Sequence, residues 1–539
     1  MRYCVYLRDW YYNSGIVGFI NVLGENEINI NKIKKDFDAK LEIGENYIEF
    51  STDILNDFYE KYKKQVFDIF FDIDNYKERI DRLIEKIKNS SGKIPKKLLQ
   101  ETALSGKVVN SFIEEVVGKD LNKIFSGQNV LKEITNVKKE LDKFKNNNDV
   151  YFYLKQKNSN FIDYFLNNEV DKRICSYQKV KEYIDKLNAD NSPKNKSQQC
   201  YICGHLKKSY DFSNAITQVL GFNSDNSNWI WGFKGSKVKI CPLCALIYTC
   251  AVPGMVFIKR NIKGEYKTFF YALNRNTNLE TLFNTFWLFK NRIEEKENQE
   301  KPFYTIVNEI TLEIVKNKAE AFFENINFIE MAENSFGGQG TKSYNVYNYN
   351  ITPDLAGFIK SLEDGQVPRG GYILNDIYYD IAEEILKKTV DMTLNYSDLS
   401  RYFDYYIRSL ELHSKYKVRY SIYTVMKYIL KYILKLKGGN MEEQAKIVGK
   451  AFGNGREVAQ KIQQENKIKG IAYQLLNDLK IADRNSFMDK YLRLSMSYGL
   501  EIKLGGNKEL TDLDNFMSFG YAFVNGLLAK SSNLNKEEE

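Results

Sequence analysis

The sequence predicts a mainly α-helical protein with an α/β N-terminal part, an inserted Cys4 zinc-binding segment and a C-terminal helical bundle. Three observations lead to this fold class. Apolar residues recur at helical spacing through most of 53–187 and again from 353 to 530. Short apolar runs and an alternating stretch at 47–50, typical of strands, are concentrated near the N-terminus. Two Cys-x-x-Cys pairs lie between the two helical regions.

The same signals divide the chain into five successive regions. In order, they are an N-terminal α/β and helical domain (1–187), a zinc-binding insertion (188–260), a mixed α/β middle region with a long Gly-rich loop (261–390), a C-terminal helical bundle (391–530) and a disordered tail (531–539). The long surface loop is expected at 334–350, where Gly and Asn are frequent. From 353 to 530 we expect almost only helices.

The composition is that of a soluble globular protein. With 539 residues and 63.0 kDa, the chain is long enough for several domains of roughly 150 residues each. Hydrophobic residues make up 43% and charged residues 27%, which excludes wholesale disorder and a multispan membrane protein. The net charge of +8 weakly favours a polyanionic partner. His205 and His413 are the only histidines, which leaves little room for His-based catalysis, so we expect a protein that is not an enzyme.

The cysteines and the N-terminus point to a reducing compartment. There are seven cysteines, an odd number, and no resemblance to a signal peptide, so we expect a cytoplasmic protein with reduced thiols. Residues 240–258 are nearly uncharged and about as long as a bilayer span, but Pro242 and Pro253 argue against a membrane helix. We interpret this stretch as a metal knuckle followed by a buried strand, and we expect no membrane association. Cys4 and Cys175 are expected to be small buried residues.

The strongest chemical signal is a pair of cysteine knuckles, Cys200-Tyr-Ile-Cys203 and Cys241-Pro-Leu-Cys244. Two residues between thiolates let both sulfurs reach one tetrahedral ion, and a second knuckle completes four ligands. Structural Zn²⁺ is the expected cofactor, because four thiolates leave no open position for a substrate. The interval 204–240 is longer than the roughly 15 to 20 residues of most zinc ribbons, so we expect a folded excursion there. A redox pair and unrelated core cysteines are the alternatives.

Other residues near the knuckles are weaker candidates. His205 and Cys250 are spare metal ligands. The excursion contains Trp229 and Trp231 among Lys and Gly residues. These tryptophans either cover the metal site or stack on bases or on a partner protein.

A basic segment near the C-terminal end is the second signal. From Leu412 to Met441 there are seven basic residues and no acidic ones. Three of the lysines recur every four residues and make one ridge on a helix, where like charges repel unless a polyanion neutralises them. We therefore predict nucleic-acid contact, with a solvated face as the alternative. The predicted contact residues are Lys415, Lys417, Arg419, Lys427, Lys431 and Lys435.

Two Gly-rich segments carry weaker signals. Residues 336–343 resemble a phosphate loop, but Thr341 separates the last glycine from Lys342, so no nucleotide site is implied. Gln339 and Lys342 are candidates for contacts in a DNA groove, because Gln pairs with adenine edges. Residues 453–456, Gly-Asn-Gly-Arg, are predicted to form a turn between two helices.

Four sets of residues together resemble one family. Residues 9–19, Asp-Trp-Tyr-Tyr-Asn-Ser-Gly-Ile-Val-Gly-Phe, look like its opening motif, with Ser14 where Ala is expected, and 41–50 look like the strand that follows. The two knuckles match the feature that names a subfamily, and 470–476 with 484–494 are similar to its C-terminal bundle. On these residues the chain resembles the large subunit of type I CRISPR Cascade complexes, CXXC-CXXC subfamily, associated with type I-B systems.

The resemblance implies a non-catalytic subunit of an RNA-guided antiviral DNA surveillance complex. Members recognise the short motif beside the target (the PAM), bind the target and displaced DNA strands and help recruit the helicase-nuclease. The implied partners are CRISPR RNA, target DNA, Cascade backbone subunits and that helicase-nuclease. A small subunit translated internally from the same gene is also expected, with Met441 as its start and Met426 or Met392 as alternatives.

Two other functions remain open at this point. One is a zinc-ribbon nucleic-acid enzyme, and the other is a zinc-bearing scaffold that binds only protein. Cleavage that depends on Mg²⁺ or Mn²⁺ would favour the enzyme. A steep fall of nucleic-acid affinity with salt would argue against the scaffold.

Overall fold

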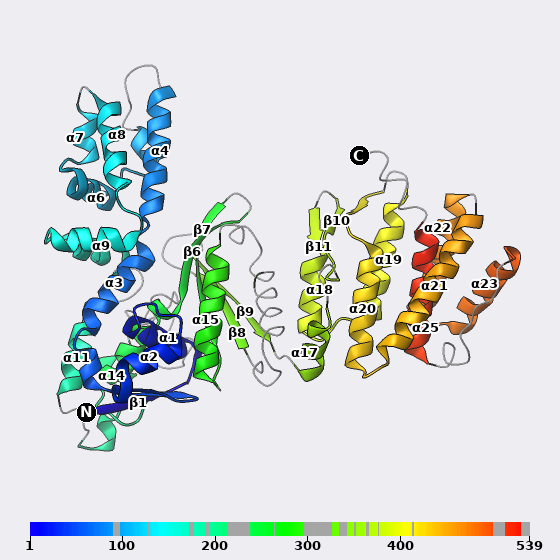
Figure 1. The fold of residues 1–539 in the computed structure, drawn as a ribbon, viewed down its shortest axis with the longest axis horizontal. Coiled ribbons are helices and arrows are strands. Elements are labelled where there is room, and N and C mark those ends of the chain that lie inside the picture. Colours follow the sequence, from blue (N-terminus) through cyan, green and yellow to red (C-terminus); the bar gives the residue numbers. More distant parts are fainter. Residues whose placement is uncertain are drawn as a thin grey trace. The chain divides into compact units, whose positions relative to one another are not determined.

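The structure is a computed structural model whose described residues form two compact units (Figure 1). Unit 1 consists of Met1–Glu300 with Ile326–Asn348, and unit 2 of Lys301–Asn325 with Tyr349–Glu539. Most described residues are helical and the sheets are small, which confirms the predicted fold class. The described residues are 1–89, 97–127, 129–171, 177–189, 194–212, 238–262, 265–276, 278–295, 306, 326–333, 342–349, 352–362, 366–375, 377–411, 414–462, 464–499 and 512–529.

Unit 1 contains a small N-terminal sheet, a group of helices, the cysteine knuckles and a larger sheet. Its helices and strands are β1 (Arg2–Tyr6), α1 (Trp10–Leu23), α2 (Ile30–Phe37), β2 (Leu41–Ile43), β3 (Tyr47–Ser51), α3 (Phe58–Phe70), α4 (Ile73–Asn89), α5 (Lys97–Glu101), α6 (Lys107–Val117), α7 (Leu121–Phe125), α8 (Val130–Leu141), α9 (Asn147–Gln156), α10 (Phe161–Leu166), α11 (Lys179–Asn188), β4 (Tyr210–Asp211), β5 (Lys239–Ile240), α14 (Pro242–Thr249), β6 (Val256–Ile262), β7 (Glu265–Asn274), α15 (Leu279–Glu294), β8 (Ile326–Glu333) and β9 (Lys342–Tyr349).

The N-terminal sheet buries one face and leaves the other open. Its strand order is β1-β3-β2, with Cys4 opposite Glu49. Side chains alternate along β1, so Tyr3 and Val5 are buried whereas Cys4 and Tyr6 are exposed. The expectation that Cys4 is buried is therefore wrong, because its two neighbours occupy the core face of the strand.

The helices from α3 to α10 pack around aromatic side chains. The Phe71 ring lies 4.7 Å from Phe67, 4.9 Å from Phe112 and 5.4 Å from Phe165, measured between ring centroids. These residues come from α3, its end, α6 and α10, so the high aromatic content serves to join separate helices. Figure 1 shows α4, α6, α7 and α8 grouped together in this part of unit 1.

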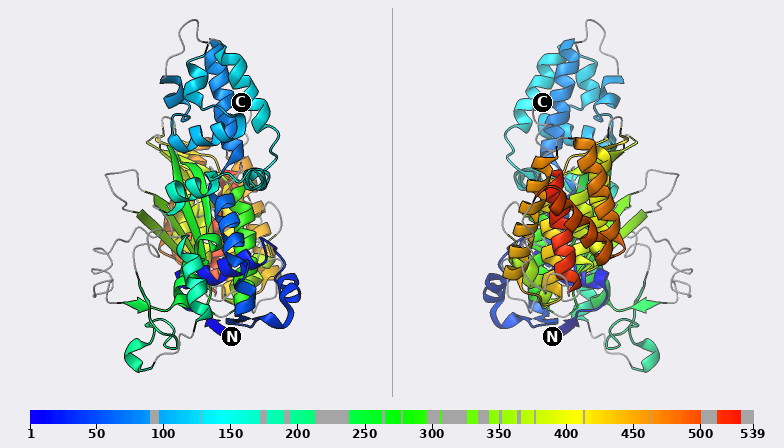
Figure 2. Two further views of the ribbon diagram at one scale, coloured as in Figure 1. Left: turned by 90° about the vertical axis from the view of Figure 1, so that its left-hand side faces the viewer. Right: turned by 90° about the vertical axis from the view of Figure 1, so that its right-hand side faces the viewer.

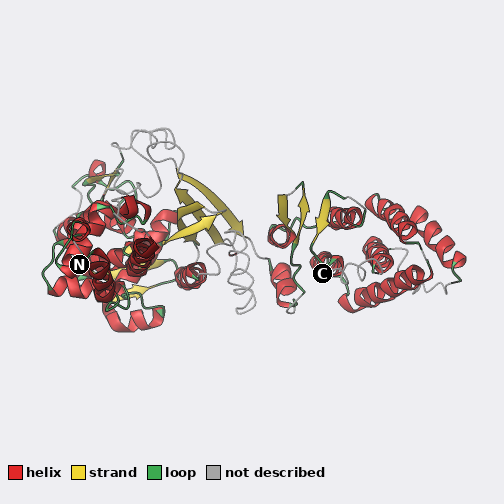
Figure 3. Cartoon of the chain, turned by 90° about the horizontal axis from the view of Figure 1, so that it is seen from above, coloured by secondary structure: helices red, strands yellow, loops and turns green. Residues whose placement is uncertain are grey.

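The larger sheet of unit 1 has the strand order β6-β7-β8-β9. Figure 3 draws the strands of the protein in yellow. The larger sheet contains a buried ion pair in which Arg260, with only 1% of its side chain exposed, lies 3.2 Å from Glu330 and donates to the Tyr271 hydroxyl at 2.9 Å. Residues 342–349, which we expected in a loop, form β9. Tyr and Val in that stretch favour a strand once a sheet edge is available to pair with.

Unit 2 contains the remaining helices and a third small sheet. Its elements are α17 (Pro353–Lys360), β10 (Gly371–Leu374), β11 (Ile377–Asp380), α18 (Ile381–Val390), α19 (Tyr396–Ser409), β12 (Tyr416–Val418), α20 (Ile422–Leu436), α21 (Met441–Lys461), α22 (Glu465–Lys480), α23 (Arg484–Ser497) and α25 (Leu513–Leu528).

The sheet of unit 2 corrects the expectation of an almost wholly helical stretch after 353. Its order is β11-β10-β12, and both pairings are antiparallel. Leu374 lies opposite Ile377, which leaves a two-residue hairpin loop. Asn375 in that loop has a φ of 50°, a conformation that Asn tolerates and that such hairpin loops require. Strands this short leave too little periodicity to outweigh the helical pattern on either side.

The C-terminal bundle packs around α25, which is buried along almost its whole length and contacts α20, α21 and α22. Figure 2 shows α25 in red among these helices. A Cβ on Gly455 would lie 2.1 Å from the Phe523 carbonyl oxygen, and one on Gly526 would lie 2.2 Å from that of Phe452. The turn predicted at 453–456 is therefore wrong, because these residues lie inside α21 and Gly455 permits close helix packing.

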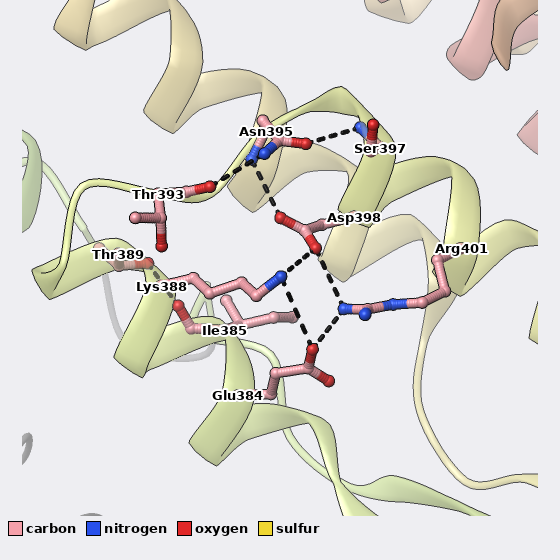
Figure 4. A network of polar contacts seen from close by, with 9 residues as sticks. All are labelled: Glu384, Ile385, Lys388, Thr389, Thr393, Asn395, Ser397, Asp398 and Arg401. Carbon is pink, nitrogen blue, oxygen red and sulfur yellow. Dashed lines mark hydrogen bonds and ion pairs between the residues drawn. The ribbon is translucent and has the colours of Figure 1, made fainter.

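A charge network joins α18 to α19 (Figure 4). Asp398, with 5% of its side chain exposed, pairs with Lys388 and lies 3.1 Å from Arg401. Its second oxygen accepts from the Asn395 backbone N–H at 3.2 Å, which completes a capping box at the start of α19. Glu384 of α18 pairs with Arg401. The buried carboxylate is thus fully paired, and it orients α19.

Candidate metal centre

The first cysteine knuckle is a tight turn held by backbone hydrogen bonds. The Cys200 N–H donates to the Leu206 carbonyl at 2.8 Å, and the Gly204 N–H donates to the Cys200 carbonyl at 2.9 Å. Gly204 has a φ of 72°, which glycine adopts without strain. Strand β4 follows and pairs with β5, which leads directly into the second knuckle. The excursion between the knuckles is therefore closed at its base by a short antiparallel pair.

The second knuckle forms the N-terminus of α14. Cys241 is the N-cap, its Sγ accepts from the Cys244 N–H at 3.4 Å, and Pro242 stands in the first turn. The helix dipole brings partial positive charge to the first turn of α14, where these two sulfurs lie. The knuckle does not lead straight into a strand as we expected. The apolar residues after it form a buried helix and the short 3-10 helix η7 (Val252–Gly254), and β6 begins only at Val256.

The four predicted metal ligands come together. The Sγ atoms of Cys200, Cys203, Cys241 and Cys244 all lie within 4.8 Å of one another, and those of Cys203 and Cys241 are 3.7 Å apart. A tetrahedral zinc centre with Zn–S bonds of about 2.3 Å has sulfurs about 3.8 Å apart, so the cluster fits this ion. Three of the cysteines are buried and Cys203 is half-buried. Four thiolates around one ion make a closed, structural type of site.

Backbone amides and neighbouring thiols set the charge on the sulfurs. Cys200 Sγ accepts from the N–H groups of Ile202 at 3.3 Å and Cys241 at 3.2 Å. Hydrogen bonding among the thiols, with Cys200 as the main partner, lowers the pKa of Cys203 and raises the pKa of Cys244. Four sulfurs this close cannot all ionise without a counter-ion. A divalent cation would remove that conflict, which is a second reason why these residues fit a metal.

Helix α1 carries the opening motif and packs directly against the second knuckle. It contacts both α14 and η7. A Cβ on Gly15 would lie 2.1 Å from the Ile247 carbonyl oxygen, and one on Gly18 would lie 1.8 Å from that of Cys250. Only glycine permits backbones to approach this closely. The two glycines of the opening motif therefore serve as packing sites for the metal-bearing segment.

Polar side chains of the opening motif also hold the knuckle. Asp9 caps α1 by accepting from the N–H groups of Tyr11 at 3.1 Å and Tyr12 at 3.0 Å, and its other oxygen accepts from the Tyr248 hydroxyl of α14 at 3.0 Å. The Tyr12 hydroxyl lies 3.7 Å from Cys244 Sγ. Burial raises the pKa of Tyr12 well above its ordinary value, so its hydroxyl keeps a proton for the ligand sulfur. Such an outer hydrogen bond orients a metal ligand and tunes its basicity.

Two asparagines extend this contact beyond the knuckle. Asn13 Nδ2 donates to the side-chain oxygens of Asn274 and Asn276, both at 2.7 Å, and Asn21 Nδ2 donates to the Pro253 carbonyl at 3.0 Å. Sequence reasoning linked the opening motif to the knuckles only through family resemblance. The available signal was a run of small residues, Ser14, Gly15 and Gly18, on an otherwise apolar helix, which indicates close helix packing.

The predicted nucleic-acid residues fall into two sets, both within unit 2. Lys415, Lys417 and Arg419 lie on and beside β12, and all three are exposed. The other three belong to α20, where Lys427 is exposed with its Nζ 5.3 Å from the Tyr423 ring centroid. The charge run identified in the sequence is thus divided between a strand and a helix.

The other two lysines of the α20 ridge lie against α17. Lys431 Nζ donates to the Ser361 carbonyl at 2.6 Å and to Gln366 Oε1 at 3.1 Å. Lys435 is half-buried, and its Cε would lie 3.4 Å from a Cβ on Gly357. The predicted ridge exists, but Lys431 lies at the C-terminal end of α17, where the helix dipole favours positive charge, and Lys435 lies beside the middle of that helix.

Several other candidates are not assembled with these sites. Gln339, Trp229, Trp231 and Cys175 lie outside the described residues, and Lys342 begins β9 with its side chain outside them too. His205 is exposed, and neither it nor the buried Cys250 belongs to the sulfur cluster. Across the described parts of the chain, no helix is both long enough and apolar enough to cross a membrane.

Comparison with known proteins points to the segment that bears the cysteines. Residues 193–256 match a family model described as CRISPR-associated protein (Cas_CXXC_CXXC). The matched residues include both knuckles and α14. No curated protein and no solved structure matches the chain. The match supports a CRISPR-associated protein of this family, and the four-cysteine cluster is consistent with a Cascade-type subunit.

Proposed function

We propose that this chain is the non-catalytic large subunit of a type I-B Cascade complex, an RNA-guided antiviral DNA surveillance complex of the cytoplasm. The observation that carries the proposal is the joining of two family features: the four-cysteine cluster, inside the matched segment, packs against the helix of the opening motif. Two features far apart in the sequence thus make one structural element.

The metal has a structural role in this proposal. Cys200, Cys203, Cys241 and Cys244 would hold Zn²⁺, and the ion would supply folding free energy to the two knuckles that it joins. Its coordination would be complete with protein ligands, so no position is left at which a substrate could bind the ion. The metal therefore braces a binding protein and takes no part in a reaction.

The remaining roles concern nucleic acid and partner proteins. Guide pairing would read the target sequence, while this subunit would recognise the flanking motif (the PAM), bind target and displaced strands and help recruit the helicase-nuclease. The exposed cations Lys415, Lys417 and Arg419 support contact with a phosphate backbone. Gln339 and Lys342 stay candidates for groove contacts. CRISPR RNA and the Cascade backbone subunits would be its constant partners.

A small subunit made from the same gene is part of the proposal. Met441 is the first residue of α21, directly after the N-cap Asn440. A product of residues 441–539 would contain α21, α22, α23 and α25, in which α25 contacts both α21 and α22. If Met441 is the start, a Met441→Leu change abolishes the short product. An unaltered amount of that product excludes Met441 and leaves Met426 or Met392.

The experiment that tests the proposed function is purification of the C-terminally tagged protein from its native host at low salt. We expect short repeat-spacer RNAs, several companion subunits and a C-terminal fragment to co-purify. A bare 63.0 kDa chain without RNA would contradict the proposal. Cleavage of DNA or RNA by that bare chain with Mg²⁺ or Mn²⁺ would then identify a zinc-ribbon enzyme, and binding of protein alone would identify a scaffold.

A further inference from the structure

The outer face of the β11-β10-β12 sheet combines an exposed ring with exposed cations. Along β12 the side chains alternate, so that Lys417 points away from the face of Tyr416 and Val418, and the exposed Lys415 lies just before the strand. Lys417 lies opposite Ile373, which in turn lies opposite Tyr378. The Arg419 N–H donates to the Gly371 carbonyl at 2.8 Å, so the same ladder continues to Arg419. Tyr378 and Lys417 thus stand on one face with Arg419 beside them.

Tyr378 lies on this face in a position suited to stacking. A Cβ on Gly371 would lie 2.7 Å from Tyr378 Cζ and 2.8 Å from its hydroxyl oxygen, so the tip of the ring covers the glycine. Even so, 51% of Tyr378 is exposed. Partial burial and Asp380 raise the pKa of Tyr378 while Arg419 opposes the rise, which places both charges near the hydroxyl. The ring of Tyr378 therefore packs on Gly371 at its tip, while about half of the residue stays accessible to a partner.

The opposite face of the sheet packs on α19 through Tyr372 and Tyr416, while Ile377 and Tyr379 of β11 stay exposed. Tyr372 stacks on Tyr379 with centroids 5.0 Å apart, and it also lies 4.5 Å from Tyr405 of α19. Tyr405 in turn stacks on Tyr416 of β12 at 5.3 Å. Since these rings hold the sheet to α19, the exposed side chains of the outer face remain available for a partner.

Charge on the outer face favours an anionic partner. Its cations are Lys417 and Arg419, with the exposed Lys415 just before β12, and Asp380 is the acidic residue among its described strand positions, where its side chain accepts from the Ala382 N–H at 2.8 Å. Positions two residues apart on a strand repeat at about 6.8 Å, which suits successive phosphates of an extended single strand better than a compact ligand. The α20 lysines at 431 and 435 already contact α17.

We propose that this outer face binds single-stranded DNA, with a base stacked on Tyr378 and the phosphate backbone along Lys415, Lys417 and Arg419. The inference rests on the proposed function, which supplies a displaced DNA strand, and it names the surface that holds the strand. Stacking on an aromatic ring accepts any base, so little sequence preference is expected. The choice of DNA over RNA comes from the displaced strand of the proposed function, because cationic side chains and an aromatic ring can contact either polymer.

The test is fluorescence anisotropy of the full-length protein with labelled oligothymidylate, over a range of salt concentrations. Y378L should weaken binding by about fivefold or more, because stacking is lost, and leave the salt slope unchanged, whereas Y378F should bind like the wild type. K417Q/R419Q should reduce the slope of log affinity against log salt by about 1.4, because two phosphate contacts are lost.

Matched controls lie in unit 1. Y6L removes an exposed tyrosine from another sheet face, and K32Q/K119Q removes two exposed charges. Both controls should bind as the wild type does. The proposal is overturned if wild-type protein fails to bind, if Y378L binds normally, or if the controls weaken binding equally. Tighter binding of oligouridylate, lost in the same variants, would overturn the assignment to DNA. Thermal unfolding of each variant shows whether it is folded, and co-purification of guide RNA tests the proposed function separately.

Discussion

In both units glycines let a helix pack closely against a neighbouring backbone, but the segments that make the contact differ. In unit 1, Gly15 and Gly18 bring α1 against the carbonyls of a segment that begins with two of the candidate metal ligands, Cys241 and Cys244. In unit 2, Gly455 and Gly526 bring α21 and α25 together, and both are long helices with their own buried faces. We therefore expect close packing at glycine to depend on metal in unit 1 and to be independent of it in unit 2. The difference suggests that the metal defines a local folding unit rather than the whole chain.

The largest effect should follow loss of a metal ligand. Cys241→Ser should abolish zinc binding and unfold the knuckles with α14 and α1, because structural zinc contributes on the order of 10 kcal/mol in small zinc domains. Unit 2 should keep its own thermal transition. Zinc content and differential scanning calorimetry check this. Cys4→Ser is the control, since Cys4 is exposed and outside the cluster. Equal loss of both transitions would contradict the comparison.

A smaller but still large effect should come from Gly18→Ala. The new Cβ would meet the Cys250 carbonyl oxygen at 1.8 Å, so the backbones must separate, and the free energy of unfolding of unit 1 should fall by about 3 kcal/mol. Chemical denaturation followed by far-UV circular dichroism measures it. Gly106→Ala, where a Cβ meets only Val109 at 3.8 Å, should change that free energy by less than about 1 kcal/mol. Similar losses in both variants would disprove the close contact.

The corresponding pair in unit 2 tests the metal-independent packing. Gly455→Ala should lower the free energy of unfolding by about 2 kcal/mol, because its Cβ would lie 2.1 Å from the Phe523 carbonyl oxygen. Gly449→Ala, in the same helix but with nothing within 4 Å of the new Cβ, should raise it by about 0.5 to 1 kcal/mol. Both are measured by urea denaturation with and without a chelator. A chelator that changed either difference would show that unit 2 also depends on metal.

The smallest effect distinguishes the members of the α20 ridge. Lys431→Met should lower the free energy of unfolding of unit 2 by about 1 kcal/mol, because its contacts to Ser361 and Gln366 are lost. Lys427→Met should change it by less than about 0.5 kcal/mol, because Lys427 is exposed. Thermal unfolding of the two variants is sufficient. If both variants have the same stability, the contacts of Lys431 with Ser361 and Gln366 do not stabilise unit 2.

Residue spacing predicted those features whose residues lie close together in the sequence. Two residues between cysteines are enough to place Cys200 with Cys203 and Cys241 with Cys244, and the four do converge. A four-residue repeat is enough to place lysines on one side of α20. The residues that this side of α20 contacts are far away in the sequence. The contact of Lys431 with the end of α17 could therefore not be predicted from the repeat.

The expectations that failed depended on partners distant in the sequence. Gly453-Asn454-Gly455 is typical of a turn when the sequence alone is considered. In the structure these residues lie inside α21, and α25 packs closely against Gly455. Cys4 reads as a small core residue until strand alternation assigns it to the open face. The hairpin around Asn375 did carry a local signal, a two-residue loop between β-forming residues, which the surrounding helical pattern obscured.

The central claim is that α1 and the metal centre fold as one element inside unit 1. Hydrogen exchange of the full-length protein, compared with and without a zinc chelator, tests it most directly. We expect the amides of 10–23 and 242–254 to lose protection together when the metal is removed, while those of 441–461 and 513–528 keep theirs. Continued protection of 10–23 after complete metal removal, or simultaneous loss in both units, would contradict the account.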